Sequence, residues 1–174
     1  MEYDFTLKFK LSDADCDSAD VVERLGAAGC DDALVGTGMP GRIALNFVRS
    51  AESASEAMVS ALRDVKTALP SAKLTEVGPD FVGLTDVADV IGVSRQNMRK
   101  LMLTHARTFP PAVHEGSTAI WHLALVLDWL QAKGSYPIAR NVIDVANSAM
   151  QFNIVKEIER VPETVRMAMR ELVA

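Results

Sequence analysis

Residues 84–102 have the sequence LTDVADVIGVSRQNMRKLM, which sets the fold expected for the middle of the chain. Two short helices that cross steeply need a small residue where they touch, and Ala88 supplies it. The turn between them needs a residue that tolerates a left-handed backbone, and Gly92 supplies it. Apolar side chains at the other constrained positions would fill a shared core: Val87, Ile91, Val93, Met98 and Leu101. The stretch therefore predicts a helix-turn-helix.

Polar and basic side chains begin the second predicted helix. Ser94 stands at its N-cap position, so the side chains that follow, Arg95, Gln96 and Asn97, would project from the start of the helix. Arginine pairs with guanine, and glutamine or asparagine with adenine, through two hydrogen bonds in the major groove. Each such pair contributes about 1–3 kcal/mol of discrimination. These residues predict contacts with the bases of double-stranded DNA.

Further cations follow in a stretch without acids. Residues 90–114 contain no Asp or Glu, and besides Arg95 they hold Arg99, Lys100 and Arg107. We expect these three side chains to contact the groove wall or the phosphates. The alternative is a helical hairpin that serves only as core and has a solvated basic face. A solvated face normally mixes both signs, so the absence of acids favours the DNA interface.

Residues 109–122, FPPAVHEGSTAIWH, follow this helix pair. They contain two short extended pieces around Glu115 and Gly116, which predict a two-stranded wing, and residues 123–130 resume as a helix. Trp121 and Trp129 fall on the return strand and the next helix, where packing in the core is expected rather than base stacking.

Three motifs in this region carry a family resemblance. They are Val-Ser-Arg-Gln before a leucine, Phe-Pro-Pro-x-Val, and Ile-Trp-x-Leu followed by x-Val-Leu-x-Trp-Leu. Together, over residues 84–130, they resemble the winged helix-turn-helix of MerR-like and AlpA (excisionase)-like DNA-binding proteins. The resemblance implies a regulator that binds operator or attachment-site DNA.

The resemblance also implies roles for individual residues. Arg95, Gln96, Arg99 and Lys100 would be contacts of the recognition helix. The wing from His114 to Ser117 would touch the flank of the site. Family members carry basic residues in the wing and after the tryptophan, where this chain has Glu115 and His122.

The first 78 residues follow a different pattern. Apolar and polar residues alternate over residues 3–11, the period of a strand with one buried face. A helix with Ser18 as its N-cap, strands over 33–35 and 43–48, a helix over 53–70 and a strand over 73–77 complete the series. This order, βαββαβ, predicts a ferredoxin-like sandwich over residues 1–78. Residues 78–80, Gly-Pro-Asp, mark the expected boundary with the winged domain at 81–133.

Residues 137–174 predict two further helices, which start at Pro137 and Pro162. The apolar face over residues 138–160 is broader than one intramolecular contact needs, so we expect these helices to form a homodimer. The alternative is that both helices fold back onto the winged domain.

Composition limits the function classes. The 174 residues are 49% hydrophobic and 24% charged, which is typical of a globular protein. No apolar run approaches the ~20 residues of a membrane helix, and the acidic start does not fit a signal peptide, so we expect a cytoplasmic protein without a membrane partner. The net charge is −5, and the acids are concentrated in residues 1–80. Cys16 and Cys30 are expected to be reduced structural thiols.

Two sequence motifs lack the neighbouring residues that their usual functions require. A Gly-x-Gly-x-x-Gly over residues 36–41 contains Pro40 and precedes a strand, so it is expected to be a hairpin loop rather than a dinucleotide site. Asp13, Asp15 and Asp17 lack the glycine and glutamate of a calcium loop and are expected to cap a helix. We find no nucleophile, metal-ligand or cofactor motif, so neither an enzyme nor a bound cofactor is expected.

The sequence therefore favours a dimeric, sequence-specific regulator of double-stranded DNA, most simply a repressor. A second hypothesis is a protein-interaction adaptor, such as an antitoxin-like neutraliser, that holds its partner through residues 1–78. A third is an excision or recombination accessory factor that bends DNA.

Overall fold

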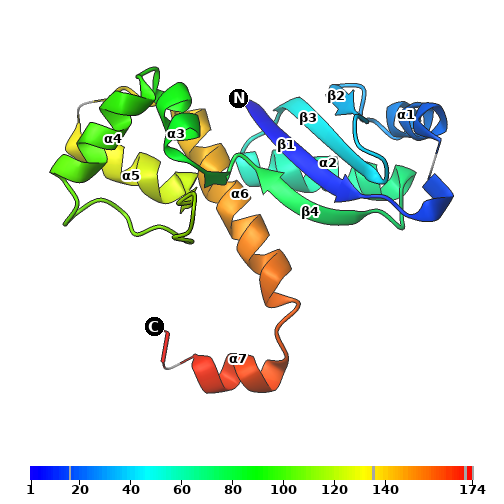
Figure 1. The fold of residues 1–174 in the computed structure, drawn as a ribbon. Helices are drawn as coiled ribbons and strands as arrows, with labels where there is room; N and C mark the ends of the chain where they lie inside the picture. The colour runs from blue at the N-terminus through cyan, green and yellow to red at the C-terminus, as the bar shows by residue number, and fades with distance from the viewer. Residues whose placement is uncertain (16, 135, 171, 174) are drawn as a thin grey trace.

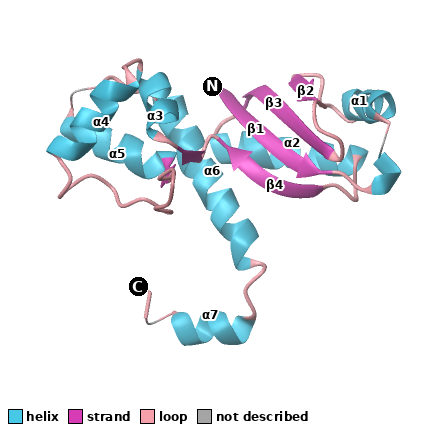
Figure 2. Cartoon of the chain, in the orientation of Figure 1, coloured by secondary structure: helices cyan, strands magenta, loops and turns pink. Residues whose placement is uncertain are grey.

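The computed structural model describes residues 1–15, 17–134, 136–170 and 172–173. The protein has a mixed α+β fold with two lobes (Figure 1). A four-stranded sheet with its helices forms the first lobe, and a group of short helices forms the second (Figure 2). One long helix runs between them.

The first lobe contains an antiparallel sheet. Its strands are β1 (Glu2–Lys10), β2 (Ala33–Gly36), β3 (Arg42–Ser50) and β4 (Lys73–Gly78), in the order β2-β3-β1-β4. The two long strands β1 and β3 are central, with Phe5 opposite Phe47 in register. The helices α1 (Ser18–Ala27) and α2 (Ala54–Ala68) pack against one face of this sheet.

The core of the first lobe follows the alternating pattern of β1. Phe5, Leu7 and Phe9 are buried, and the ring of Phe5 stacks on Phe47 with 5.4 Å between centroids. Leu25 of α1 and Met58 of α2 fill the same core, together with other apolar side chains of both helices. The prediction of a strand with one buried face is confirmed.

The two helices of this lobe start at side-chain caps. Ser53 caps α2, because its hydroxyl accepts a hydrogen bond from the N–H of Glu56. The expectation that Ser18 caps α1 is wrong: Ser18 is already helical, and Asp17 before it has the extended backbone of an N-cap. The carboxylate of Asp17 accepts from the N–H of Ala19 at 2.9 Å.

The second lobe is built from short elements. They are β5 (Phe81–Val82), α3 (Leu84–Ile91), α4 (Arg95–Thr104), β6 (Trp121–His122) and α5 (Leu123–Lys133). β5 and β6 pair antiparallel, with Val82 opposite Trp121. Leu123, Leu127 and Leu130 of α5 are fully buried in the core of this lobe.

The long helix α6 (Arg140–Ile158) belongs to both cores. Val145 and Ala149 pack into the core of the first lobe, whereas Ile143 and Ala146 pack into that of the second. Two intramolecular surfaces thus account for the breadth of its apolar face. The helix begins at Arg140 rather than at Pro137, because the backbone at Ala139 is extended and Ile138 packs against the second core. α7 (Glu163–Met169) follows, with no buried residue.

A buried polar cluster joins α6 to the segment between the lobes. Asp80, 1% exposed, accepts from the side-chain amide of Asn153 at 2.8 Å. The other oxygen of this carboxylate lies 2.7 Å from Nδ1 of His122. The backbone carbonyl of Asp80 accepts from the N–H of Leu123 at 2.7 Å, which fixes the start of α5. Among the described residues, no helix combines the length and hydropathy needed to cross a bilayer.

Candidate nucleic-acid interface

Residues 84–102 form two short helices, α3 and α4, joined by a turn. α3 ends at Gly92, whose φ of 71° and ψ of 35° place it in the left-handed region that favours glycine. The N–H of Val93 then bonds back to the carbonyl of Ala88 at 2.9 Å. Ala88 is buried, and α3 and α4 are in contact.

One side of each helix faces the core of the second lobe. Val87 and Met98 are buried, and Ile91, Val93 and Leu101 are partly buried against the same core. All five positions predicted to be internal therefore pack as expected. The opposite side of α4 is left for solvent.

Ser94 caps the start of α4. Its hydroxyl accepts a hydrogen bond from the N–H of Asn97 at 3.2 Å, as predicted for an N-cap residue. The backbone at Ser94 is extended and turns helical at Arg95. The cap fixes the point from which the side chains of α4 project.

The predicted contact residues of α4 are exposed. Among the described residues, Arg95, Arg99 and Lys100 form no ion pair, and the side chains of Gln96 and Asn97 form no hydrogen bond. Their donors are therefore available to a ligand. With no acid on α4, nothing on the helix offsets their positive charge.

Helical spacing places the exposed side chains of α4 at the centre or at the edges of one face. Gln96, Lys100 and Leu103 recur at intervals of four and three, on the side opposite Met98, and Arg99 lies beside them. Arg95 and Asn97 lie at the edges of this face. Leu103 is 58% exposed, although it is a large apolar residue. Sequence reasoning missed it, because leucine in a predicted helix is normally assigned to the core.

Positive charge continues past the end of α4. Arg107 is exposed in the turn that follows, and His105 terminates the helix. Nζ of Lys133, at the end of α5, lies 3.5 Å from Nδ1 of His105 and 5.1 Å from the ring centroid of Trp129. Folding therefore brings Lys133 to the same surface. We call Arg95, Arg99, Lys100, Arg107 and Lys133 the basic surface.

Acidic residues border this surface on α3. Asp86 and Asp89 are exposed, and the carboxylate of Asp86 accepts from the N–H of Gly83 at 2.7 Å, which fixes the start of α3. The positive charge of the lobe is thus confined to α4 and the segments beyond it. This contrast makes α4, rather than α3, the helix suited to approach an anionic ligand.

The predicted wing is smaller than expected. Its two pieces meet only at an isolated bridge between His114 and Ile120, and Trp121 and His122 pair instead with β5. Pieces this short have no clear period of two, so the sequence did not reveal this pairing. His114 and Ser117 are exposed at the tip, and a Cβ at Gly116 would come within 2.6 Å of Nε2 of His114.

The two tryptophans pack as structural residues, as predicted. The ring of Phe109 makes edge contacts with both, at 6.0 Å from Trp121 and 5.1 Å from Trp129. Nε1 of Trp121 donates to the carbonyl of Pro110 at 3.1 Å. The Phe-Pro-Pro segment is thereby held against α5, and the tryptophan rings are not presented to a ligand.

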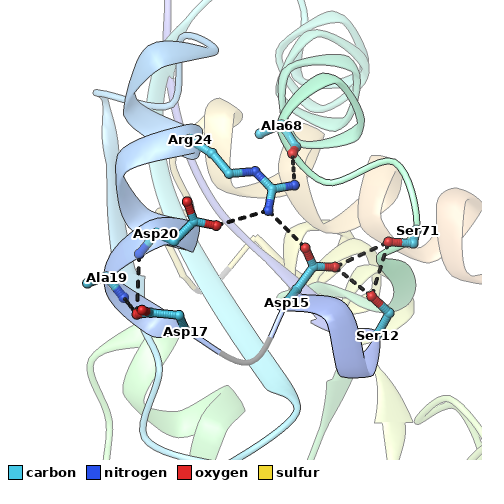
Figure 3. A network of polar contacts seen from close by, with 8 residues as sticks. All are labelled: Ser12, Asp15, Asp17, Ala19, Asp20, Arg24, Ala68 and Ser71. Carbon is cyan, nitrogen blue, oxygen red and sulfur yellow. Dashed lines mark hydrogen bonds and ion pairs between the residues drawn. The ribbon is translucent and has the colours of Figure 1, made fainter.

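The aspartates near the end of β1 hold the first lobe together (Figure 3). Asp15, at the end of the 3-10 helix η1 (Asp13–Asp15), accepts from the hydroxyls of Ser12 and Ser71 and pairs with Arg24 at 3.0 Å. The Ser12 hydroxyl, followed by Arg24 and Ser71, lowers the pKa of Asp15 against the opposing effect of burial. Among the described residues, no group of three His, Cys, Asp or Glu side chains could hold a metal ion.

The other two features of the first lobe are structural as well. The glycine-rich residues 36–41 connect the antiparallel strands β2 and β3, so the prediction of a hairpin loop is confirmed. Cys30 is buried and free, and burial raises the pKa of its thiol to about 11. Cys16 lies outside the described residues.

Comparison with protein-family models, with curated proteins and with solved structures returned no match.

Proposed function

We propose that this protein is a sequence-specific regulator that binds double-stranded DNA, most simply a dimeric repressor that occludes its operator. In this proposal α3 and α4 are the helix-turn-helix of a winged domain, and residues 1–78 are a ferredoxin-like domain. The strand order β2-β3-β1-β4, with α1 and α2 on one face, supports the second assignment.

The observation that carries the proposal is the exposed, acid-free face of α4. Its cations form no internal ion pair among the described residues, although the whole chain has a net charge of −5. Three unpaired cations on one short helix without an acid create a local positive potential on an acidic protein, and such a potential attracts a phosphate backbone.

The side chains of this face suit the major groove. Gln96 can bond to adenine, and Arg99 or Lys100 to guanine. The exposed methyl groups of Leu103 suit contact with the methyl group of thymine. Arg95 and Asn97, expected from the sequence to contact bases, lie at the edges of this face, where phosphates would pass, and Arg107 lies beyond the end of α4. In this arrangement His114 and Ser117 contact the flank of the site.

Selection of binding sites from random duplexes tests the proposal directly. We expect enrichment of one sequence, with inverted half-sites about one helical turn or a multiple apart. Arg99→Ala should weaken binding of that duplex by at least about tenfold, equivalent to 1.4 kcal/mol. Arg63→Ala is the matched control, because Arg63 is an exposed cation of α2 without an ion pair among the described residues.

Two outcomes would count against the assignment. One is that no duplex is enriched at low salt. The other is that Arg99→Ala and Arg63→Ala bind the selected duplex equally well. A selected duplex that migrates as a bent molecule in a circular-permutation assay would instead favour an excision or recombination accessory factor.

A specific observation favours the adaptor as second candidate. Leu34 and Val48 are exposed near each other on the face of the sheet that α1 and α2 leave open, beside the short edge strand β2. Such a patch suits a protein partner. The adaptor would be supported if the full chain bound no duplex and if Leu34→Asp abolished a stoichiometric complex with a purified partner.

A further inference from the structure

The end of α6 and all of α7 are uncovered. Asn153 is the last buried residue of α6, and every described residue from Glu157 onward is exposed. α7 lies away from both lobes (Figure 1). We call residues 154–170 and 172–173 the C-terminal arm.

The arm carries an unusual number of exposed apolar side chains: Ile154, Val155, Ile158, Val161, Val165, Met167, Met169, Leu172 and Val173. Val165 and Met169 lie one turn apart on the same side of α7, and Leu172 is exposed in the turn just beyond its end. Val161 is exposed in the connection before α7 and Ile158 at the end of α6, and we call these five side chains the apolar stripe. A helix as short as α7 is unstable alone in water, so the stripe implies a surface that covers it.

The charges of the arm fit a second copy of the arm. Glu157, Glu159 and Glu163 alternate with four cations: Lys156, Arg160, Arg166 and Arg170. Ion pairs between neighbours, Lys156 with Glu157 and Arg160 with Glu157, show how closely the two signs are mixed. A surface that is nearly neutral and mixed in sign matches itself, but it suits neither DNA nor a strongly charged protein.

The area is close to that of a standard interface. Without Met167, which lies on the side of α7 opposite Val165 and Met169, eight exposed apolar side chains remain. If each offers on the order of 100 Å², together they provide roughly 800 Å², compared with about 800 Å² per partner in a standard interface. Neither lobe of the same chain covers this area, since every described residue from Glu157 onward is exposed. α6 is held to the first lobe by the bonds of Asn153 to Val77, and Lys156 donates to the carbonyl of Thr75.

We infer that the C-terminal arm is the surface on which a second copy of this chain docks, arm against arm about a two-fold axis. This surface would join the two copies of the proposed regulator, and its biological purpose rests on that proposed function. It differs from the expectation for residues 137–174, because most of α6 is occupied within the chain and only the arm is left for the partner.

Sedimentation equilibrium of the full chain tests the inference without DNA. At about 10 µM we expect a mass of twice the 18.9 kDa monomer. Met169→Glu should raise the dissociation constant of the dimer by at least about tenfold, because it places a charge in the stripe. The matched control is Met167→Glu, two residues away and on the opposite side of α7, which should leave the dimer intact.

Met167→Glu should keep the circular dichroism and the Tm of the unmodified chain. Met169→Glu should keep a cooperative unfolding transition, since α7 contributes to neither core, while its Tm falls because the dimer no longer stabilises the fold. A monomeric full chain, a dimeric Met169→Glu variant, or equal dissociation by both substitutions would overturn the inference. Binding of a single half-site by the Met169→Glu monomer is measured separately. If the full chain dimerises but no half-site binds, the proposed function fails and the inferred dimer surface stands. If a half-site binds but the full chain is monomeric, the inferred dimer surface fails and the proposed DNA binding stands.

Discussion

The side-chain amide of Asn153 donates to the buried carboxylate of Asp80 across 2.8 Å and to the carbonyl of Val77 across 2.7 Å. Its carbonyl oxygen accepts from the N–H of Val77 at 2.9 Å. One side chain of α6 therefore satisfies polar groups of β4 and of the segment between the lobes. Asn153 is 1% exposed, so water cannot replace it.

Asn153→Ala should destabilise the protein by about 2–4 kcal/mol, because it leaves two backbone groups and part of a carboxylate buried without partners. Urea denaturation followed by tryptophan fluorescence measures the change in the free energy of unfolding. Asn147→Ala is the control on the same helix, since the amide of Asn147 is partly exposed and donates within α6 to the carbonyl of Ile143. Equal midpoints for the two variants would contradict this role.

The main helices and strands were predictable from local sequence, but the contacts between them were not. The alternation over residues 3–11 and the glycine at position 92 each restrict the backbone locally, and β1 and the α3–α4 turn formed as expected. The broad apolar face of α6 indicated that partners exist, but hydrophobicity alone does not say which surface covers it. Long-range pairs such as Asn153 with Val77 have no local signal at all.

Substitutions at Ser94 test the stability of α4 and its proposed DNA binding separately. Ser94→Ala should cost about 1 kcal/mol through loss of the cap. Ser94→Asp should retain or improve stability, because an aspartate caps well and its charge is favourable at a helix N-terminus. The same aspartate should weaken DNA binding, because it repels phosphates. Thermal unfolding and duplex titration on both variants check this; tight DNA binding by Ser94→Asp would contradict the proposed orientation of α4.

Leu103 gives a test of base contact that does not involve charge. Leu103→Ala should preserve the free energy of unfolding within about 0.5 kcal/mol, since the side chain is exposed. It should reduce discrimination for thymine at one position of the selected duplex without changing the dependence of affinity on salt. Titration of duplexes with single substitutions at two salt concentrations provides the measurement. A changed salt dependence with unaltered sequence preference would refute the assigned contact.

The candidate interface was only partly predictable for a related reason. Exposure of Arg95, Arg99 and Lys100 follows from helical spacing within one segment. Lys133 joins them only because α5 packs beside the end of α4, where its ammonium group lies near His105. His105 and Lys133 are 28 positions apart, and nothing in the sequence between them indicates this proximity.

Asp15 should make stability depend on pH in the acid range. Its pKa is lowered in the folded state, chiefly by the Ser12 hydroxyl and also by Arg24, so its stabilising effect is complete above the unfolded value near 3.8. That effect is lost as the pH falls through the lower folded pKa. At pH 7, Asp15→Asn should cost about 1–3 kcal/mol, from loss of hydrogen bonds to a charged group.

The difference between the unmodified chain and Asp15→Asn should therefore stay constant from pH 7 to about pH 5 and shrink below about pH 4. Urea denaturation at each pH gives this difference. Asp31→Asn, at an exposed position, should change stability by less than about 0.5 kcal/mol throughout. The assigned role would be excluded if the difference in free energy of unfolding between the unmodified protein and Asp15→Asn grew as the pH fell.

Cys30 should be nearly inert in the folded protein. Burial, reinforced by the carboxylate of Asp64, raises the pKa of its thiol to about 11, so only on the order of a thousandth is thiolate at pH 8. In a Cys16→Ser background, where Cys30 is the single thiol, reaction with Ellman's reagent at pH 8 should be slower than in urea by at least about a hundredfold. Equal rates in the folded and denatured protein would show that Cys30 is accessible and ionised, contrary to its packing beside α2.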